Sequence, residues 1–278
     1  MNNGFYTVTG GMVTQFNRLD QISENLANVR TNGYKQKRQI VGDFLRLYQE
    51  RRDTLPLPNN TVEAAKFLNR SIDRVPRVVD EYTDFKMGGM VHTGNPFDLA
   101  LGEKNLFFAV ETPQGVRLTR DGAFKLNEDG ELVTREGFKV LSQNWFNNHR
   151  AIRIPVDALH VSVGKSGRIE YMDQTAMDTP VYLDDIMVVR VDDLRALKAV
   201  GDNYFDTEGK DLLNEMHVVT DTDKVFQYTI EKSNVDPVRE MTALIETNRL
   251  VEMYQKVMSA QMDDMNSDAI NKLANVRA

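Results

Sequence analysis

Apolar residues in the first thirty positions recur with the spacing of an amphipathic helix. One row returns every seven residues, and a second row lies three residues further on: Phe5, Met12, Leu19 and Leu26, then Val8, Ile22 and Val29. We expect this stripe to be buried in a helical contact. Gly10 and Gly11 each cost a helix roughly 1 kcal/mol, so we expect a bent or frayed start. The Asn- and Gly-rich segment 28–33 predicts the end of the helix.

The C-terminal end carries a second helical pattern. Asp236 and Pro237 are a good helix start, because the Asp side chain can cap the first amides and proline needs no amide partner. Neither Gly nor Pro occurs from Val238 to the end, which leaves room for a helix of roughly 35 residues. A Met-rich stripe follows it: Met241, Leu244, Val251, Met258, Met262, Met265 and Ala269. This length suits a coiled coil, and methionine suits buried packing.

The middle of the chain has the pattern of short strands. Glycine-containing turns end at Gly115, Gly122, Gly130 and Gly137, with short alternating runs between them. This spacing predicts a β-meander. Strand-like runs at 186–191 and 227–230 extend the β region to about residue 232.

These patterns together predict an α+β protein. We expect N- and C-terminal amphipathic helices, in residues 1–45 and 232–278, that pair as a coiled-coil-like layer. Residues 46–86, polar and proline-containing, form an extended connector with a short helix near 64–68. Residues 87–231 form a central all-β domain of short strands. The pattern leaves open whether the helices pair within one chain or pack against other copies.

Composition excludes several classes of function. The 278 residues are 41% hydrophobic and 27% charged, as in ordinary globular proteins, and the net charge of -7 argues against a nucleic-acid binder. Cysteine is absent, which removes disulfides, thiolate metal sites and cysteine nucleophiles. No apolar run approaches the ~18 residues of a membrane span, and the first residues lack the pattern of a cleaved signal, so we expect no membrane insertion.

Candidate catalytic and metal-binding motifs are weak. The four histidines are not at metal-ligand spacing, and the sequence Gly164-Lys165-Ser166 lacks the first glycine of a phosphate loop, so it is read as a hairpin turn. Adjacent acidic residues such as Asp184 and Asp185 face opposite sides of a strand. We therefore predict no catalytic residue, no cofactor and no metal site.

One motif carries a family resemblance. Residues 25–35 contain Asn25, Leu26, Ala27, Asn28, Thr31, Gly33, Tyr34 and Lys35. This sequence resembles the pattern N-L-A-N-x-x-T-x-G-[FY]-K of bacterial flagellar rod and hook proteins. The blocks 95–101, 107–110, 119–124, 130–134 and 231–241 are also similar to that family, in the same order. Residues 102–106 depart from its usual glycine-aromatic turn.

The resemblance implies a structural function rather than an enzyme. Such proteins polymerise helically into the axial shaft that transmits torque and encloses the export channel, with terminal helices forming the inner tube. The predicted inter-subunit packing residues are then Met12, Leu19, Ile22, Leu26, Val29, Met241, Leu244, Val251, Met258, Met262 and Met265. The family's motif turn comprises Asn25, Asn28, Thr31, Gly33, Tyr34 and Lys35.

The resemblance also implies partners and a location. Expected partners are further copies, other flagellar rod proteins, hook-basal body components, the ring proteins around the rod and the export apparatus. The expected location is the periplasmic rod of the flagellar basal body, reached without a cleaved signal peptide. Because the segment from Leu47 to Lys86 does not resemble the distal-rod insertion, a proximal-rod type is favoured. The alternatives are a distal rod, hook or junction protein, a scaffolding protein for rod assembly, and, from another class, a surface enzyme or adhesin.

Overall fold

The computed structural model describes residues 2–43, 76–145, 151–173, 179–201, 203–207, 216–219 and 224–275. The helix expected near 64–68 and most of the expected connector lie outside these residues. The chain forms two compact units. The first, called here the helical unit, comprises Met1–Leu26, Lys37–Tyr82 and Asp236–Ala278. The second, the β unit, comprises Ala27–Gln36 and Thr83–Val235, so the motif begins in the helical unit with Asn25 and Leu26 and continues in the β unit from Ala27 on.

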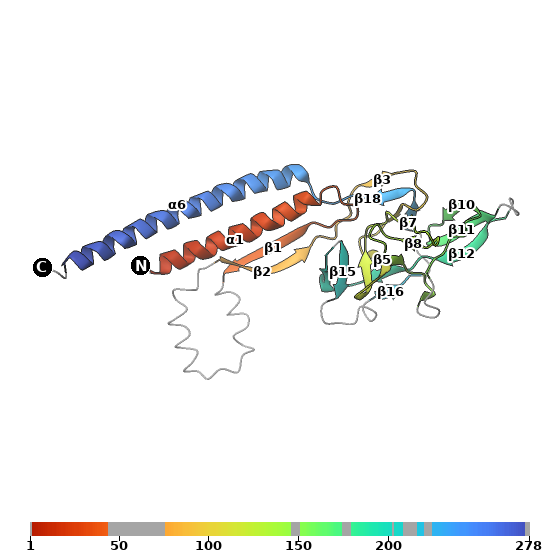
Figure 1. The fold of residues 1–278 in the computed structure, drawn as a ribbon, viewed down its shortest axis with the longest axis horizontal. Coiled ribbons are helices and arrows are strands. Elements are labelled where there is room, and N and C mark those ends of the chain that lie inside the picture. Colours follow the sequence, from red (N-terminus) through yellow and green to blue (C-terminus); the bar gives the residue numbers. More distant parts are fainter. Residues whose placement is uncertain are drawn as a thin grey trace, which may run out of the picture. The chain divides into compact units, whose positions relative to one another are not determined.

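The helical unit contains two long helices and a two-stranded ribbon. Helix α1 spans Asn2–Ala27 and helix α6 spans Pro237–Asn275. Strands β1 (Lys37–Asp43) and β2 (Pro76–Thr83) pair with each other. The two helices lie side by side and run in opposite directions, with α1 next to the ribbon (Figure 1). A helix at each end of a central β region confirms that part of the predicted fold.

Both predicted helix boundaries have a clear local cause. Asp236 Oδ1 accepts hydrogen bonds from the amides of Val238 at 3.0 Å and Arg239 at 3.3 Å, which is the expected N-cap of α6. Helix α1 ends at Ala27, before the Asn- and Gly-rich turn. The helix continues through the glycine pair at which a bend was expected. A Cβ on Gly11 would lie 2.7 Å from the Tyr254 ring, so this glycine makes room for α6.

The β unit is built around a nine-stranded sheet. Its main path has the order β14-β15-β6-β5-β9-β8-β7, and β13 pairs with both β5 and β16. Smaller sheets pair β10-β11-β12, β17 with β4, and β18 with β3. The strands are β3 Met90–His92, β4 Leu99–Leu101, β5 Leu106–Thr112, β6 Gly115–Thr119, β7 Lys125–Leu126, β8 Leu132–Val133, β9 Lys139–Val140, β10 Ala158–Val163, β11 Arg168–Asp173, β12 Val181–Asp185, β13 Val188–Val191, β14 Leu197–Ala199, β15 Tyr204–Thr207, β16 Met216–Val218, β17 Val225–Gln227 and β18 Thr229–Glu231.

The predicted meander is present in two pieces. Strands β5 and β6 form a hairpin that ends in Gly115, and β7, β8 and β9 form a meander that turns at Gly130 and Gly137. The prediction is wrong at Gly122, because three strands lie between β6 and β7 in the sheet. Gly122 instead allows close approach of β4: a Cβ there would lie 1.8 Å from the carbonyl oxygen of Leu99. The hairpin turn predicted at residues 164–167 is confirmed between β10 and β11.

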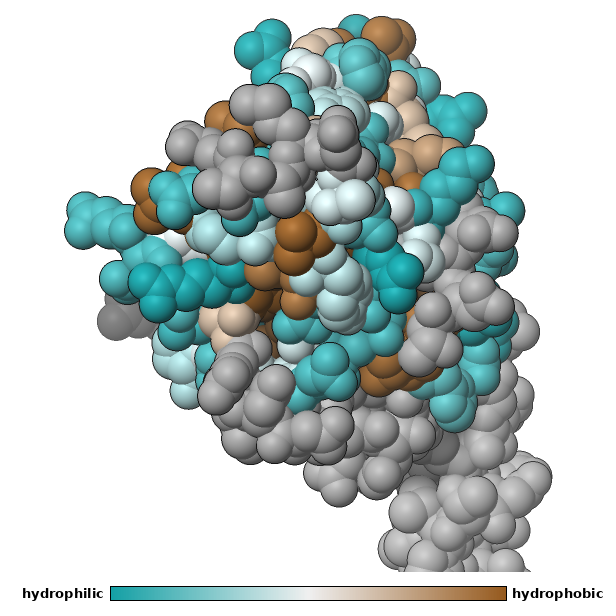
Figure 2. Space-filling view, turned by 90° about the vertical axis from the view of Figure 1, so that its right-hand side faces the viewer, coloured by the Kyte–Doolittle hydropathy of each residue, from teal (hydrophilic) through white to brown (hydrophobic). Residues whose placement is uncertain are grey.

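The core lies on both sides of strand β5, because alternate side chains of a strand point to opposite faces. Phe108 and Val110 belong to one buried cluster, and Phe107 and Ala109 to the other. The outer face of the β unit seen in Figure 2 is mostly hydrophilic, with apolar side chains in small separate groups. The two clusters bury large apolar side chains within the unit, whereas others, such as Val156, Val200 and Tyr182, remain exposed.

Candidate assembly site

Helix α6 has apolar residues on its exposed surface as well as on its buried face. Val251 and Thr247 lie on the buried face. Val238, Met241 and Ile245 are 72%, 56% and 55% exposed, at positions i, i+3 and i+7. At about 100° per residue, this outer stripe lies roughly 120–180° around α6 from Thr247 and roughly 80–140° from Val251. The helix therefore presents an apolar surface that the chain itself does not cover.

The predicted packing residues differ in how far their own chain covers them. Ile22 and Val251 are buried within the chain. Six are half-buried: Met12, Leu19, Leu26, Val29, Leu244 and Met258. Met241, Met262 and Met265 are exposed. The last group leaves much of its apolar surface available, whereas the burial of Ile22 and Val251 is already explained by the fold of one chain.

Heptad reasoning missed a second set of apolar residues. These are exposed on α1, on the ribbon and on α6: Val13, Phe16, Ile40, Val41, Tyr82, Val238, Ile245, Met253 and Ile270. The signal was present as a second row at i, i+3 spacing on each helix, such as Val13 with Phe16. Because a heptad pattern defines one stripe per helix, it assigns only one apolar face to each helix.

Unpaired polar atoms occur in the same unit. Among the residues that the structure describes, the amide groups of four half-buried glutamines each leave one buried atom without a hydrogen bond: Gln15 Oε1, Gln21 Nε2, Gln39 Oε1 and Gln261 Oε1. Leaving a buried polar atom unsatisfied costs about 1–3 kcal/mol. The helical unit thus combines uncovered apolar area with unmet hydrogen-bonding capacity.

Asn25, the first residue of the motif, joins three elements of the helical unit. Its Oδ1 accepts a hydrogen bond from the amide of Lys37 at 3.0 Å, and its Nδ2 donates to the carbonyl of Lys37 at 3.0 Å. The same Nδ2 donates to Glu240 Oε2 at 3.4 Å. The buried Asn25 side chain therefore pairs with the start of β1 as a neighbouring strand would, and also contacts the first turn of α6.

The next motif residues form two tight turns in the β unit. The amide and the hydroxyl of Thr31 donate to the backbone oxygen and to Oδ1 of Asn28, both at 3.1 Å. The amide of Tyr34 donates to the carbonyl of Thr31 at 3.4 Å, and the Tyr34 side chain is buried. The segment therefore turns sharply after the helix, as the motif predicts, and the Tyr34 side chain that follows is buried.

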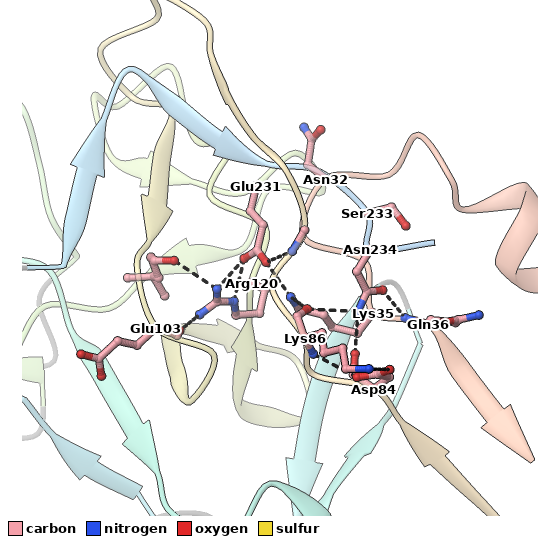
Figure 3. Close-up of polar contacts among 12 residues, drawn as sticks. Asn32, Lys35, Gln36, Asp84, Lys86, Glu103, Arg120, Glu231, Ser233 and Asn234 are labelled. Atoms are coloured by element: carbon pink, nitrogen blue, oxygen red, sulfur yellow. Dashed lines mark hydrogen bonds and ion pairs between the residues drawn. The ribbon is translucent and has the colours of Figure 1, made fainter. Parts of the chain in front are cut away.

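Gly33 and Lys35 fix this turn to the rest of the β unit. Gly33 has a φ of +66°, and a Cβ there would lie 2.4 Å from the carbonyl carbon of Arg120, so only glycine fits. The buried Lys35 ammonium donates to Glu231 Oε1 at 2.6 Å and to the carbonyl of Lys86 at 2.8 Å (Figure 3). Burial lowers the pKa of Lys35 to about 8, although the Glu231 carboxylate opposes this shift.

In the described part of the chain, no three His, Asp or Glu side chains are grouped so that they could hold a metal ion. None of the helices described is long and apolar enough to cross a membrane. The acidic pair at Asp184 and Asp185 is engaged locally: Asp184 accepts from the next amide, and Asp185 accepts from the Tyr182 hydroxyl.

Comparison with known proteins gives two regions of family similarity. The family model described as the flagellar hook protein FlgE/F/G D1 domain matches residues 104–171. The family model described as the flagellar basal body rod FlgEFG protein C-terminal region matches residues 227–272. The first region lies in the β unit, and the second runs from β17 into α6.

Similar proteins match along nearly their whole length. The flagellar basal-body rod protein FlgG of Agrobacterium fabrum is 31% identical over 260 residues, covering 92% of this chain and 94% of the relative. FlgF of Caulobacter vibrioides is 30% identical over 278 residues, covering 99% of this chain and all of the relative. FlgG of Borreliella burgdorferi is 28% identical over 265 residues. The chain therefore belongs to the family of flagellar basal-body rod proteins, structural subunits of the bacterial flagellum.

Proposed function

We propose that this chain polymerises helically into the axial rod of the basal body, which transmits torque and encloses the export channel. The role is structural rather than catalytic. The observation that carries the proposal is the uncovered apolar stripe of α6, Val238, Met241 and Ile245, in a chain of the rod family. The subunit is exported to the periplasmic rod.

The stripe supports assembly through the hydrophobic effect. Full burial of a Val, Ile or Met side chain stabilises a contact by about 1.5–3 kcal/mol. With more than half of each side chain exposed, covering the three residues by a second copy contributes about 3–5 kcal/mol per contact. A surface that meets a different surface of the next copy generates an open helical array.

In the assembled rod, α1 and α6 form a coiled-coil-like layer. The half-buried and exposed heptad residues, among them Leu19, Leu26, Leu244 and Met262, pack both within one chain and against neighbouring copies. The pairing of Gly11 with Tyr254 supports the antiparallel register of this layer. The β unit forms the outer layer, in keeping with the hydrophilic face in Figure 2.

The proposed position is the proximal rod. The partners there are further copies, other rod proteins, hook-basal body components, the rings around the rod and the export apparatus. Relatives carry the names FlgG and FlgF, and distal-rod, hook-junction and scaffolding roles are the alternatives. These roles differ in where assembly stops when the protein is missing.

The experiment is deletion of the gene followed by electron tomography of the basal bodies. We expect basal bodies with a truncated rod and no hook, and recovery of complete structures when a wild-type copy is returned. A stop at the base of the rod supports the proximal position, and a stop near the outer rings supports the distal one. Complete rods and hooks in the deletion strain would contradict the proposed function.

A further inference from the structure

Glu231, the last residue of β18, is the centre of a buried polar network (Figure 3). Its Oε1 accepts from the Lys35 ammonium at 2.6 Å and from the amide of Gly88 at 2.8 Å. Its Oε2 accepts from Arg120 Nε at 2.9 Å and Nη2 at 2.5 Å. The Lys35, Arg120 and Glu231 side chains are at most 1% exposed. One carboxylate therefore binds groups from three distant parts of the sequence.

Arg120 attaches this carboxylate to the core sheet. Its Nη1 donates to the carbonyls of Glu103 at 2.5 Å and Leu106 at 2.6 Å. Its Nη2 also donates to the carbonyl of Leu101 at 3.2 Å. These carbonyls lie at the end of β4 and around the start of β5. Because the guanidinium is a rigid fork, it fixes where the carboxylate can lie.

A second group of hydrogen bonds joins the same segments. Asn234 Nδ2 donates to the carbonyl of Asp84 at 2.7 Å, and its Oδ1 accepts from the amide of Gln36 at 2.7 Å. Lys232 donates through its ammonium to Asn32 Oδ1 at 2.9 Å. The network thus covers residues 32–36, 84–88 and 231–234.

These three segments are the connections of the β unit to the rest of the chain. Residues 28–36 lie in sequence between α1 and β1. Residues 84–88 follow β2, and residues 231–235 lead into α6. Every point at which the described chain passes between the two units is therefore within a few residues of a member of the network.

The stability of the fold does not by itself explain a buried cluster of three charged side chains. Burying three charges costs solvation, and well-packed apolar residues of similar volume are often as stable or more stable. All five N–H groups of the Arg120 guanidinium, however, have defined acceptors, and both Glu231 oxygens accept hydrogen bonds, which favours one arrangement of the segments. Its geometry therefore points to a role in ordering the connections.

We propose that Glu231 is a positioning residue that locks the three connecting segments into one cooperative unit, so that they order and yield together. The inference rests on the proposed function. In a rod subunit, torque passes along the chain between the helical layer and the β unit. Connecting segments that can unfold only together resist rotation under torque better than segments that unfold one at a time.

Hydrogen exchange of the full-length protein tests this coupling. In the variant Glu231→Gln, we expect peptides covering 32–36, 84–88 and 231–235 to exchange at least tenfold faster. We expect strand 106–112 to be unchanged. The matched control is Glu131→Gln, since Glu131 is also a carboxylate of the β unit that pairs with a lysine, Lys139, but is partly exposed. Faster exchange confined to 231–235, or no change, would overturn the proposal.

A second variant keeps the test informative if Glu231→Gln does not fold. Lys35→Met keeps an unbranched side chain that is one atom shorter and removes the charge, and we expect it also to speed exchange in all three segments. In the double variant with Glu231→Gln, the effects should be clearly less than additive, because both act on one network. Independent, additive effects restricted to each residue's own segment would contradict the coupling.

A swimming assay distinguishes failure of this inference from failure of the proposed function. If a wild-type copy does not restore swimming to the deletion strain, the proposed function fails. If the wild-type copy restores swimming, we expect Glu231→Gln to swim more slowly than Glu131→Gln in viscous medium. Equal swimming together with unchanged exchange would refute the coupling and leave the rod function intact.

Discussion

Replacement of Gly33 by alanine probes the motif turn directly. Gly33 has a φ of +66°, and its amide donates to the carbonyl of Glu231 at 2.7 Å. An added Cβ would lie 2.4 Å from the carbonyl carbon of Arg120 and 2.5 Å from the amide of Asp121. Alanine therefore meets two separate costs at this position, one conformational and one steric.

The control for the first cost is Gly137→Ala. Gly137 also has a positive φ, +96°, but open space surrounds the position of its Cβ. Left-handed backbone costs a residue with a Cβ about 1–2 kcal/mol. Overpacking against fixed backbone adds about 1–3 kcal/mol, and loss of the Gly33 hydrogen bond about 1 kcal/mol. We therefore expect Gly33→Ala to lower the free energy of unfolding by about 3–6 kcal/mol, against about 1–2 kcal/mol for Gly137→Ala.

Urea denaturation followed by tryptophan fluorescence measures this difference. The chain has one tryptophan, and Trp145 is buried in the core of the β unit, so the signal reports on that unit. The midpoint should fall much further for Gly33→Ala than for Gly137→Ala, at similar slope. Equal midpoints would refute the assignment of Gly33 as a site of close backbone contact.

Three further predictions follow from particular contacts. Asn25→Asp should destabilise the helical unit more than Asn25→Ala at pH 7, as measured by circular dichroism at 222 nm. The new carboxylate would face the Glu240 carboxylate and would lack the N–H group that Asn25 donates to it. Equal destabilisation by the two substitutions would contradict this prediction. Burial raises the pKa of Asp121 to about 6, so in this pH range the folded state binds more protons than the unfolded state. The free energy of unfolding should therefore fall as the pH rises from about 4 to 6. The variant Asp121→Asn should not show this fall in urea denaturation. Gly11→Ala should destabilise α1 by about 1–3 kcal/mol despite alanine's higher helix propensity, and Tyr254→Ala should relieve much of that loss in thermal melts.

Local signals in the sequence predict the elements well. The N-cap at Asp236, the end of α1 at Ala27 and the hairpin turns at Gly115, Gly130 and Gly137 all depend on a few neighbouring residues. Strand order depends on distant residues instead. For that reason the turn-like sequence at residues 120–122 suggested a hairpin, whereas Gly122 in fact allows the backbone of β4 to approach closely.

The site was less predictable than the fold. Heptad spacing identified Ile22 and Val251, which the fold of one chain already buries. It overlooked Ile245, because an outward apolar residue looks like an ordinary interruption of a polar face. The roles of Lys35 and Glu231 could not be derived from spacing, since 196 residues separate the two partners.

The central claim is that the chain assembles into the rod through its terminal helices. The most direct measurement is complementation of the deletion strain with Ile245→Asp, with Val200→Asp as the control. The two side chains are 55% and 54% exposed, in the helical unit and the β unit respectively. Ile245→Asp should be produced as a folded subunit but give basal bodies without a complete rod and no swimming, whereas Val200→Asp should swim. Complete rods and normal swimming with Ile245→Asp would contradict the claim.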